Sequence, residues 1–262
     1  MFGTFLGTRI YYEQSGAGEH HVLLLHGWGC TAKHFEPIAQ ALSEQYHVTA
    51  IDFPAHGRSD RPAEPWGVPE FAAMTAELIE QLGLAPVDII AHSFGARVAI
   101  YLAAQYPQLV NRLVLTGAAG LIAPASSKRR AKTTLYKALR GLAESAPARA
   151  LLGEKRVNAL REALIQKFGS ADYRALSPTM RPTFNRVIHQ DLRPHLPSIK
   201  SPALLIWGAK DDQTPLWMGK VMEGEIPDAG LVVFEDAGHF AYLERYGDFR
   251  AIVMNFLEES NA

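Results

Sequence analysis

Short apolar runs alternate with helical patterns along most of the chain. Runs rich in Val, Leu and Ile that end at a glycine or a polar loop are typical of buried strands. Apolar residues at spacings of three and four between these runs indicate helices that bury one face. The predicted strands are 5–13, 22–25, 48–52, 87–91, 113–115, 203–207 and 231–234, and the predicted helices are 31–45, 69–82, 96–105, 215–223 and 242–258.

The alternation stops between residues 121 and 200, where helical segments rich in Ala, Arg and Lys are separated by prolines. Alternating strands and helices predict an α/β fold, a mostly parallel central sheet with helices on both faces. The interruption has no obvious core of its own. We therefore predict a core domain of residues 1–120 and 201–262, with residues 121–200 inserted as a helical cap.

Composition excludes several classes of protein. The longest unbroken apolar run is Val98 to Ala104, far shorter than the roughly 20 residues of a membrane-spanning helix. The first residues lack the basic flank and apolar stretch of a secretory signal. A single cysteine, Cys30, excludes an internal disulfide and a cysteine-rich zinc site. A cytoplasmic enzyme without a metal ion is the expectation.

Ser93 is the first candidate for chemistry, because it stands where a predicted buried strand meets a helix. Its segment reads Ala91-His92-Ser93-Phe94-Gly95. A nucleophile at such a sharp turn needs small residues two places before and after it. A serine that merely caps a helix would explain the local sequence equally well.

A serine nucleophile requires a base and an orienting carboxylate, and both have candidates further along the chain. Asp211 and His239 each follow a predicted strand. All three side chains would then lie beyond the carboxyl ends of parallel strands, where open α/β sheets bind ligands. Another glycine-rich turn, His26-Gly27-Trp28-Gly29, follows the strand 22–25. It nominates the backbone amides of Trp28 and Phe94 as donors to a developing oxyanion.

Together these segments resemble the α/β-hydrolase superfamily over nearly the whole chain. Residues 26–29 resemble its oxyanion loop, and 91–95 its nucleophile elbow, with Ala91 in place of the first glycine. Residues 52–60 resemble its Asp-x-x-Gly-x-Gly-x-Ser segment, with Ala55 at the first glycine. Residues 208–215 and 238–239 resemble the loops of the acid and the base.

The resemblance implies a triad of Ser93, Asp211 and His239. It favours Asp211 over Asp212, because the family places the acid three residues after the glycine, here Gly208. Asp236 is a further alternative, three residues before His239. Haloalkane dehalogenases and epoxide hydrolases of this fold carry Asp at the elbow, so Ser93 favours acyl chemistry.

Charge is divided unevenly along the chain, although the formal net charge is only -1. Residues 121–200 hold 16 Lys or Arg against five acidic residues, a net of +11, and the remainder carries -12. The basic run is either a solvated helical face or a basic lid that attracts an anionic substrate or carrier. No base-stacking motif accompanies it, so nucleic acid is not an expected partner.

The leading hypothesis is a serine hydrolase, without a cofactor, that cleaves a carboxylic ester or thioester of a small-molecule acyl substrate. Carbon–carbon bond hydrolysis or lyase chemistry with the same triad is the alternative, since members of the superfamily with this elbow do both. A non-catalytic ligand receptor on the same fold is a third.

Overall fold

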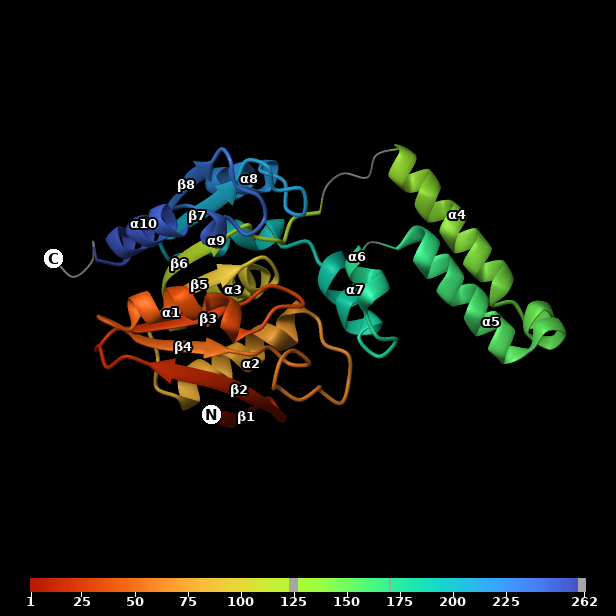
Figure 1. Ribbon diagram of the computed structural model, residues 1–262, viewed down its shortest axis with the longest axis horizontal. Coiled ribbons are helices and arrows are strands. Elements are labelled where there is room, and N and C mark those ends of the chain that lie inside the picture. Colours follow the sequence, from red (N-terminus) through yellow and green to blue (C-terminus); the bar gives the residue numbers. More distant parts are fainter. Residues whose placement is uncertain (123–126, 170, 259–262) are drawn as a thin grey trace. The chain divides into compact units, whose positions relative to one another are not determined.

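The computed structural model describes residues 1–122, 127–169 and 171–258, and it divides the chain into two compact units (Figure 1). The core unit comprises residues 1–121 and 186–262, and the helical unit comprises residues 122–185. Within the described part of the chain, no helix combines the length and the apolar character needed to span a membrane.

An eight-stranded sheet forms the centre of the core unit, in the order β1-β2-β4-β3-β5-β6-β7-β8. The first two strands run antiparallel to their neighbours, and all pairings from β4 to β8 are parallel. The strands are β1 (Phe2–Phe5), β2 (Thr8–Ser15), β3 (His21–Leu25), β4 (His47–Ile51), β5 (Val87–His92), β6 (Val110–Thr116), β7 (Ala203–Gly208) and β8 (Ala229–Phe234).

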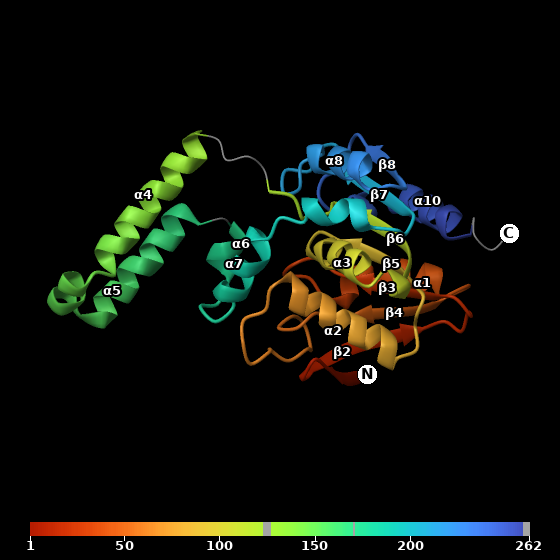
Figure 2. The same ribbon diagram turned by 180° about the vertical axis from the view of Figure 1, so that it is seen from behind.

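Helices cover both faces of this sheet, as the sequence predicts. Alternate residues of β3 enter different apolar clusters: Leu23 and Leu25 one, Val22 and Leu24 the other. The first cluster includes side chains of α2 (Val68–Gln81), α3 (Phe94–Gln105) and α8 (Trp217–Glu225). The second includes those of α1 (Glu36–Leu42), α9 (Ala241–Glu244) and α10 (Tyr246–Glu258). Figure 1 views the sheet from the side of α1 and α10, and Figure 2 from that of α2 and α3.

Three predicted elements are interrupted in the structure. The segment 5–13 is not one strand, because Leu6 and Gly7 adopt positive φ angles of 47° and 70° and turn β1 back onto β2. The predicted helix 31–45 begins as a 3₁₀ turn, Ala32–Phe35, before α1. The predicted helix 242–258 is divided at Arg245, whose φ of -122° is not helical.

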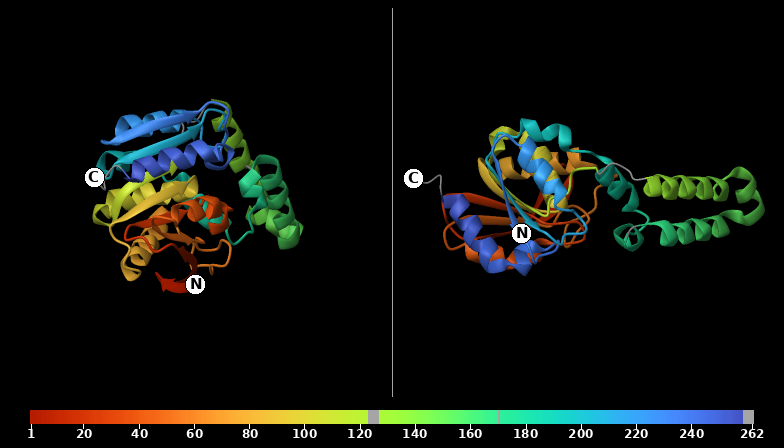
Figure 3. Two further views of the ribbon diagram at one scale, coloured as in Figure 1. Left: turned by 60° about the vertical axis from the view of Figure 1, so that its left-hand side comes forward. Right: turned by 90° about the horizontal axis from the view of Figure 1, so that it is seen from above.

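The helical unit contains α4 (Ser127–Ala143), α5 (Ala146–Phe168), α6 (Ala171–Ala175) and most of α7 (Arg181–His189). Helices α4 and α5 form an antiparallel hairpin, seen from two sides in Figure 3. Gly153 breaks α5 with a φ of 75°. An ion pair of the buried Arg181 with the half-exposed Glu162 links α7 to α5 at 2.6 Å.

Residues 186–200, which the sequence pattern assigns to the insertion, belong to the core unit. Their apolar side chains join the same cluster as those of α3. Four of these side chains are buried there: Val187, Leu192, Leu196 and Ile199. Arg97 of α3 fixes the segment, since its Nη1 donates to the carbonyl oxygens of Val187 and Gln190 at 2.8 and 2.7 Å.

Candidate active site

Ser93 stands in a strained turn between β5 and α3. Its φ of 52° and ψ of -108° lie in a region that residues with a side chain rarely adopt. The amide of Ser93 donates to the carbonyl of Thr116, which holds the turn against β6. A Cβ atom at Gly95 would lie 2.1 Å from the carbonyl oxygen of Leu25, so only glycine fits there. These contacts give the steric reason for small residues around Ser93.

The side chains of Ser93, His239 and Asp211 form a continuous hydrogen-bonded chain. His239 Nε2 lies 3.1 Å from Ser93 Oγ, and His239 Nδ1 lies 2.8 Å from Asp211 Oδ2. An ionised carboxylate only accepts hydrogen bonds, so Nδ1 carries the proton and Nε2 is left to accept from the serine hydroxyl. The three residues follow β5, β8 and β7, whose carboxyl ends meet at one edge of the sheet.

Asp211 is held as a carboxylate by a dense set of donors. Its Oδ1 accepts the amides of Gln213 and Thr214, and its Oδ2 accepts from His239. Thr214 Oγ1 lies 2.7 Å from Oδ2 and 2.9 Å from the carbonyl oxygen of Gly117. Burial opposes ionisation, but the hydrogen bonds from His239 and Thr214 outweigh it, and the pKa of Asp211 lies below its usual value.

Neither of the other two carboxylates occupies this position. Asp212 is exposed. Asp236 is also largely exposed and pairs with Arg245 at 2.5 Å, which holds the pKa of that carboxyl below its ordinary value. The loop of residues 236–239 is thus tied through Asp236 to Arg245, between α9 and α10, while Asp211 contacts the imidazole.

The glycine-rich loop 26–29 lies directly beside the elbow. A Cβ atom at Gly27 would lie 3.4 Å from the Cβ of Ser93 and 2.8 Å from His92 Nδ1. Phe94 opens α3, and amides of the first helical turn lack acceptors within their own helix. The two loops that carry the nominated amides, those of Trp28 and Phe94, are therefore adjacent.

An aromatic cluster supports both of these loops. The rings of Trp28 and Phe94 meet edge to face with centroids 5.2 Å apart. The buried imidazole of His56 contacts each of them, at 5.0 Å from Trp28 and 6.3 Å from Phe94. Aromatic contacts of this kind add about 0.5–1.5 kcal/mol beyond the area they bury. The ring of His56 thus contacts both Trp28, in the loop 26–29, and Phe94, the residue after Ser93.

Two buried histidines position backbone rather than reactive groups. His26 Nε2 accepts the amide of Phe53 at 2.9 Å, and its Nδ1 donates to the carbonyl oxygen of Gly27 at 2.7 Å. His92 Nε2 donates to the carbonyl oxygen of His239 at 3.0 Å, which fixes the loop of the base. Cys30 is buried beside these loops, and burial raises the pKa of its thiol.

Thr214 and His56 are the functional candidates that sequence reasoning missed. Thr214 stands only three residues after Asp211, so the length of the loop is the signal that could have identified it. His56 lies within the segment 52–60, but nothing in the linear sequence indicates that its ring contacts Trp28 and Phe94, which come from two other segments.

We predict that Thr214→Val lowers kcat/KM for an ester about tenfold, because a hydrogen bond to a charged group contributes about 1.5–3 kcal/mol. Thr214→Ser retains the hydroxyl and should stay close to the unmodified protein. Steady-state kinetics of the two variants make the comparison. A loss in Thr214→Ser without a loss in Thr214→Val would show that the methyl group matters and the hydroxyl does not.

A second prediction concerns acid stability. Burial lowers the pKa of His92 to about 3, whereas an unfolded histidine titrates near its ordinary value of 6.5. The unfolded state therefore binds more protons between those values. We expect the free energy of unfolding to fall by about 1.4 kcal/mol for each pH unit from 6.5 towards 3 on account of His92 alone.

Urea unfolding at several pH values between 7 and 5 measures this slope. His92→Leu should make it shallower, and His20→Gln, which alters an exposed histidine, should leave it unchanged. A slope that His92→Leu does not alter would contradict the assignment.

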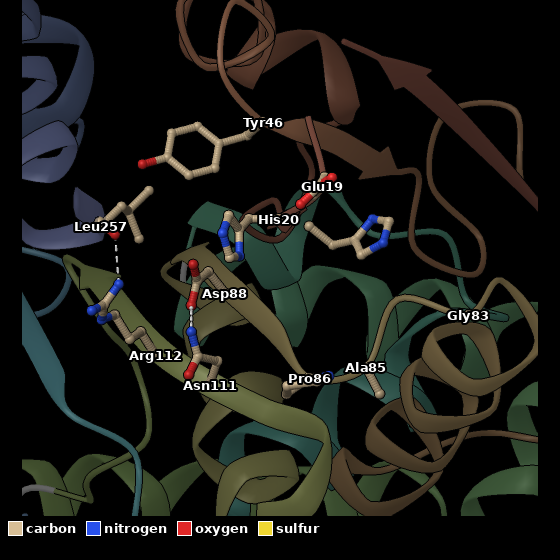
Figure 4. Close-up of a pocket in the computed structure, with 11 residues that line it drawn as sticks. Glu19, His20, Tyr46, Gly83, Ala85, Pro86, Asp88, Asn111, Arg112 and Leu257 are labelled. Atoms are coloured by element: carbon tan, nitrogen blue, oxygen red, sulfur yellow. Dashed lines mark hydrogen bonds between the residues drawn. The ribbon is translucent and has the colours of Figure 1, made fainter. Parts of the chain in front are cut away.

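A cavity of about 480 Å³ lies at the opposite end of the strands from Ser93, at the amino ends of β3, β5 and β6 (Figure 4). Two of its lining side chains are engaged in hydrogen bonds. Asp88 accepts from Asn111 at 2.7 Å, which joins β5 to β6, and Arg112 donates to the carbonyl oxygen of Leu257 at 2.6 Å, which attaches α10 to β6. Both contacts lie at the opposite end of the strands from Ser93.

Comparison with known proteins identifies the family to which the chain is similar. The family described as alpha/beta hydrolase fold matches residues 20–246. The chain is 30% identical over 254 residues to the pimeloyl-[acyl-carrier protein] methyl ester esterase of Neisseria meningitidis serogroup C, covering 90% of this chain and 93% of that protein.

Two solved structures are similar over almost their whole length. An esterase from Exiguobacterium antarcticum matches with a TM-score of 0.73 and 26% identity, covering 98% of this chain and 99% of that one. A hydrolase from Pseudomonas aeruginosa matches with a TM-score of 0.73 and 25% identity, covering 98% and 97%.

Proposed function

Because the chain belongs to the alpha/beta hydrolase fold family, we propose that it is a serine hydrolase that cleaves a carboxylic ester or thioester. The observation that carries the proposal is the hydrogen-bonded chain from Ser93 through His239 to Asp211. A serine hydroxyl becomes a useful nucleophile only when a base can remove its proton, and this chain supplies the base and holds its orientation.

In the proposed mechanism, His239 takes the proton of Ser93 as Oγ attacks the acyl carbonyl carbon. Asp211 stabilises the resulting imidazolium and keeps Nδ1 protonated. The imidazolium then donates its proton to the leaving alcohol or thiol, which leaves the acyl group on Ser93. Water, deprotonated by His239, attacks this acyl-enzyme and releases the acid.

The amides of Trp28 and Phe94 are the proposed donors to the oxyanion of both tetrahedral intermediates. Support comes from the adjacency of the loop 26–29 to the elbow and from the aromatic contacts that hold it. Donors fixed in advance at the position of developing charge contribute about 2.7–4 kcal/mol each to transition-state stabilisation.

The relatives favour an ester as the substrate. One is an esterase for a methyl ester on an acyl carrier protein, and another is described simply as an esterase. An anionic acyl substrate or carrier would also suit the positive charge of residues 121–200. We propose that the helical unit serves as the cap that selects among such substrates.

A substrate panel tests the ester assignment. Turnover of p-nitrophenyl esters and of methyl monoesters of dicarboxylic acids should exceed turnover of a vinylogous diketone, the substrate type of carbon–carbon bond hydrolases. A strong preference for the diketone would replace the proposal by its alternative. Ligand-induced stabilisation without turnover of any member would instead indicate a receptor.

A further inference from the structure

The hairpin of α4 and α5 carries a row of leucines on its outside. Leu135, Leu139 and Leu142 stand at positions i, i+4 and i+7 of α4, and all three are exposed, Leu142 by 69%. At 100° per residue they fall within about 60° of one another, so they form one apolar face. Leu151, at the start of α5, is 84% exposed.

The interior of the hairpin is made by other side chains. The ring of Tyr136 meets that of Phe168 on α5 with centroids 5.9 Å apart, and Val157 and Ile165 of α5 are buried. Tyr136 points about 100° away from Leu135, about 120° from Leu142 and about 60° from Leu139 around α4. Leu135 and Leu142, the two most exposed leucines of the row, therefore point away from the surface through which α4 packs on α5.

Basic charge accompanies this apolar face. Residues 127–168 carry 11 Lys or Arg against three Glu, a net of +8. Each of the three glutamates already pairs with an arginine: Glu144 with Arg140 and Arg161, Glu154 with Arg149, and Glu162 with Arg181.

Exposed cations remain on the hairpin after these pairs are formed. Across the residues whose side chains the structure describes, Lys137, Lys155 and Arg156 have no carboxylate partner. Lys128, Arg129, Arg130 and Lys132 also belong to α4, but their side chains lie outside the described part of the chain. The unpaired positive charge of these side chains favours binding to an anionic partner.

We propose that the α4–α5 hairpin binds the surface of an anionic phospholipid bilayer, with the leucine row inserted among the acyl chains and the lysines and arginines at the headgroups. An amphipathic helix with Leu on one face and Lys or Arg on the rest is suited to this interface, because each face meets a surface of matching chemistry. An anionic soluble partner would satisfy the charges but would leave the leucines in water.

Co-sedimentation of the full-length protein with vesicles tests the proposal. Vesicles of phosphatidylcholine alone are compared with an equal mixture of phosphatidylcholine and phosphatidylglycerol, at low and high salt. The protein should bind the mixed vesicles, bind them less at high salt, and bind the neutral vesicles weakly.

Combined replacement Leu135→Gln, Leu139→Gln and Leu142→Gln should reduce the partition to mixed vesicles roughly tenfold or more. The matched control replaces two exposed leucines of the core unit, Leu6→Gln and Leu243→Gln, and should bind like the unmodified protein. Circular dichroism verifies that both variants are folded. Because vesicle binding is read without turnover, its result is independent of the proposed catalysis.

Any of five results would overturn the proposal. The protein does not bind the mixed vesicles, or it binds neutral ones equally well. The leucine variant binds as strongly as the control, which would show that charge alone accounts for vesicle binding. The protein binds an acidic carrier protein or a second copy of itself but no vesicle. The leucine variant loses turnover of a soluble ester while its vesicle binding is unchanged, which would assign the row to substrate binding.

Discussion

Replacement of Ser93 by alanine is expected to abolish ester hydrolysis, lowering kcat by about a million-fold. The reason is chemical, since without Oγ no acyl-enzyme forms and His239 has no hydroxyl to deprotonate. Residual turnover would come from substrate binding and the oxyanion donors acting on water. Kinetics with an activated ester measure the loss.

Two controls accompany the Ser93→Ala variant: it should remain folded, and its affinity for the substrate should be unchanged. Alanine removes only one oxygen and leaves the backbone hydrogen bond from the Ser93 amide to the Thr116 carbonyl. The positive φ at this position is unfavourable for alanine as well as for serine, so the strain is unchanged. A folded Ser93→Ala protein that keeps even a hundredth of the activity would remove Ser93 from the mechanism.

Asp211→Asn is expected to lower kcat about ten thousand-fold with little change in the fold. An asparagine can present an amide proton towards His239 Nδ1, which would shift the ring proton to Nε2, the atom that must accept from Ser93. The variant also loses the negative charge that stabilises the imidazolium.

Matched replacements of the two neighbouring carboxylates, Asp212→Asn and Asp236→Asn, test whether the effect is specific. Asp212 is exposed, and Asp236 is bound to Arg245 rather than to the imidazole. Both variants should retain activity within a few-fold. A loss at Asp236 as large as that at Asp211 would contradict the assignment of the acid.

Local patterns predict the parallel part of the sheet and place Ser93, Asp211 and His239 after its strands, and the resemblance to the α/β hydrolases selects Asp211 among the neighbouring carboxylates. Buried parallel strands are continuous apolar runs, and their carboxyl ends converge at one edge of a sheet. Polar residues just after three such runs, Ser93, Asp211 and His239, are therefore near one another even though up to 146 positions separate them.

What the sequence could not supply depends on contacts between distant segments. The ring of His56 meets Trp28 edge to face and stacks on Phe94, so it joins three segments that are distant in the sequence. Residues 186–200 contain no strand pattern that would separate them from the insertion before them. Only the burial of side chains such as Val187 and Leu196 against α3 assigns them to the core unit.

The turn after Leu6 was missed for a related reason. Residues 5–13 partly alternate, and the reversal depends on positive φ angles at two adjacent positions, one of them a leucine. Leucine rarely adopts that conformation, so composition did not indicate a turn there.

The central claim is that Ser93 becomes acylated, and covalent labelling tests it most directly. A fluorophosphonate reacts with a serine only when a base activates it, and the product mimics the tetrahedral intermediate. Mass spectrometry of the intact protein and its peptides should show one adduct, located on Ser93 and absent from Ser93→Ala. A folded protein that takes up no label, or takes it up elsewhere and equally in the variant, would contradict the account.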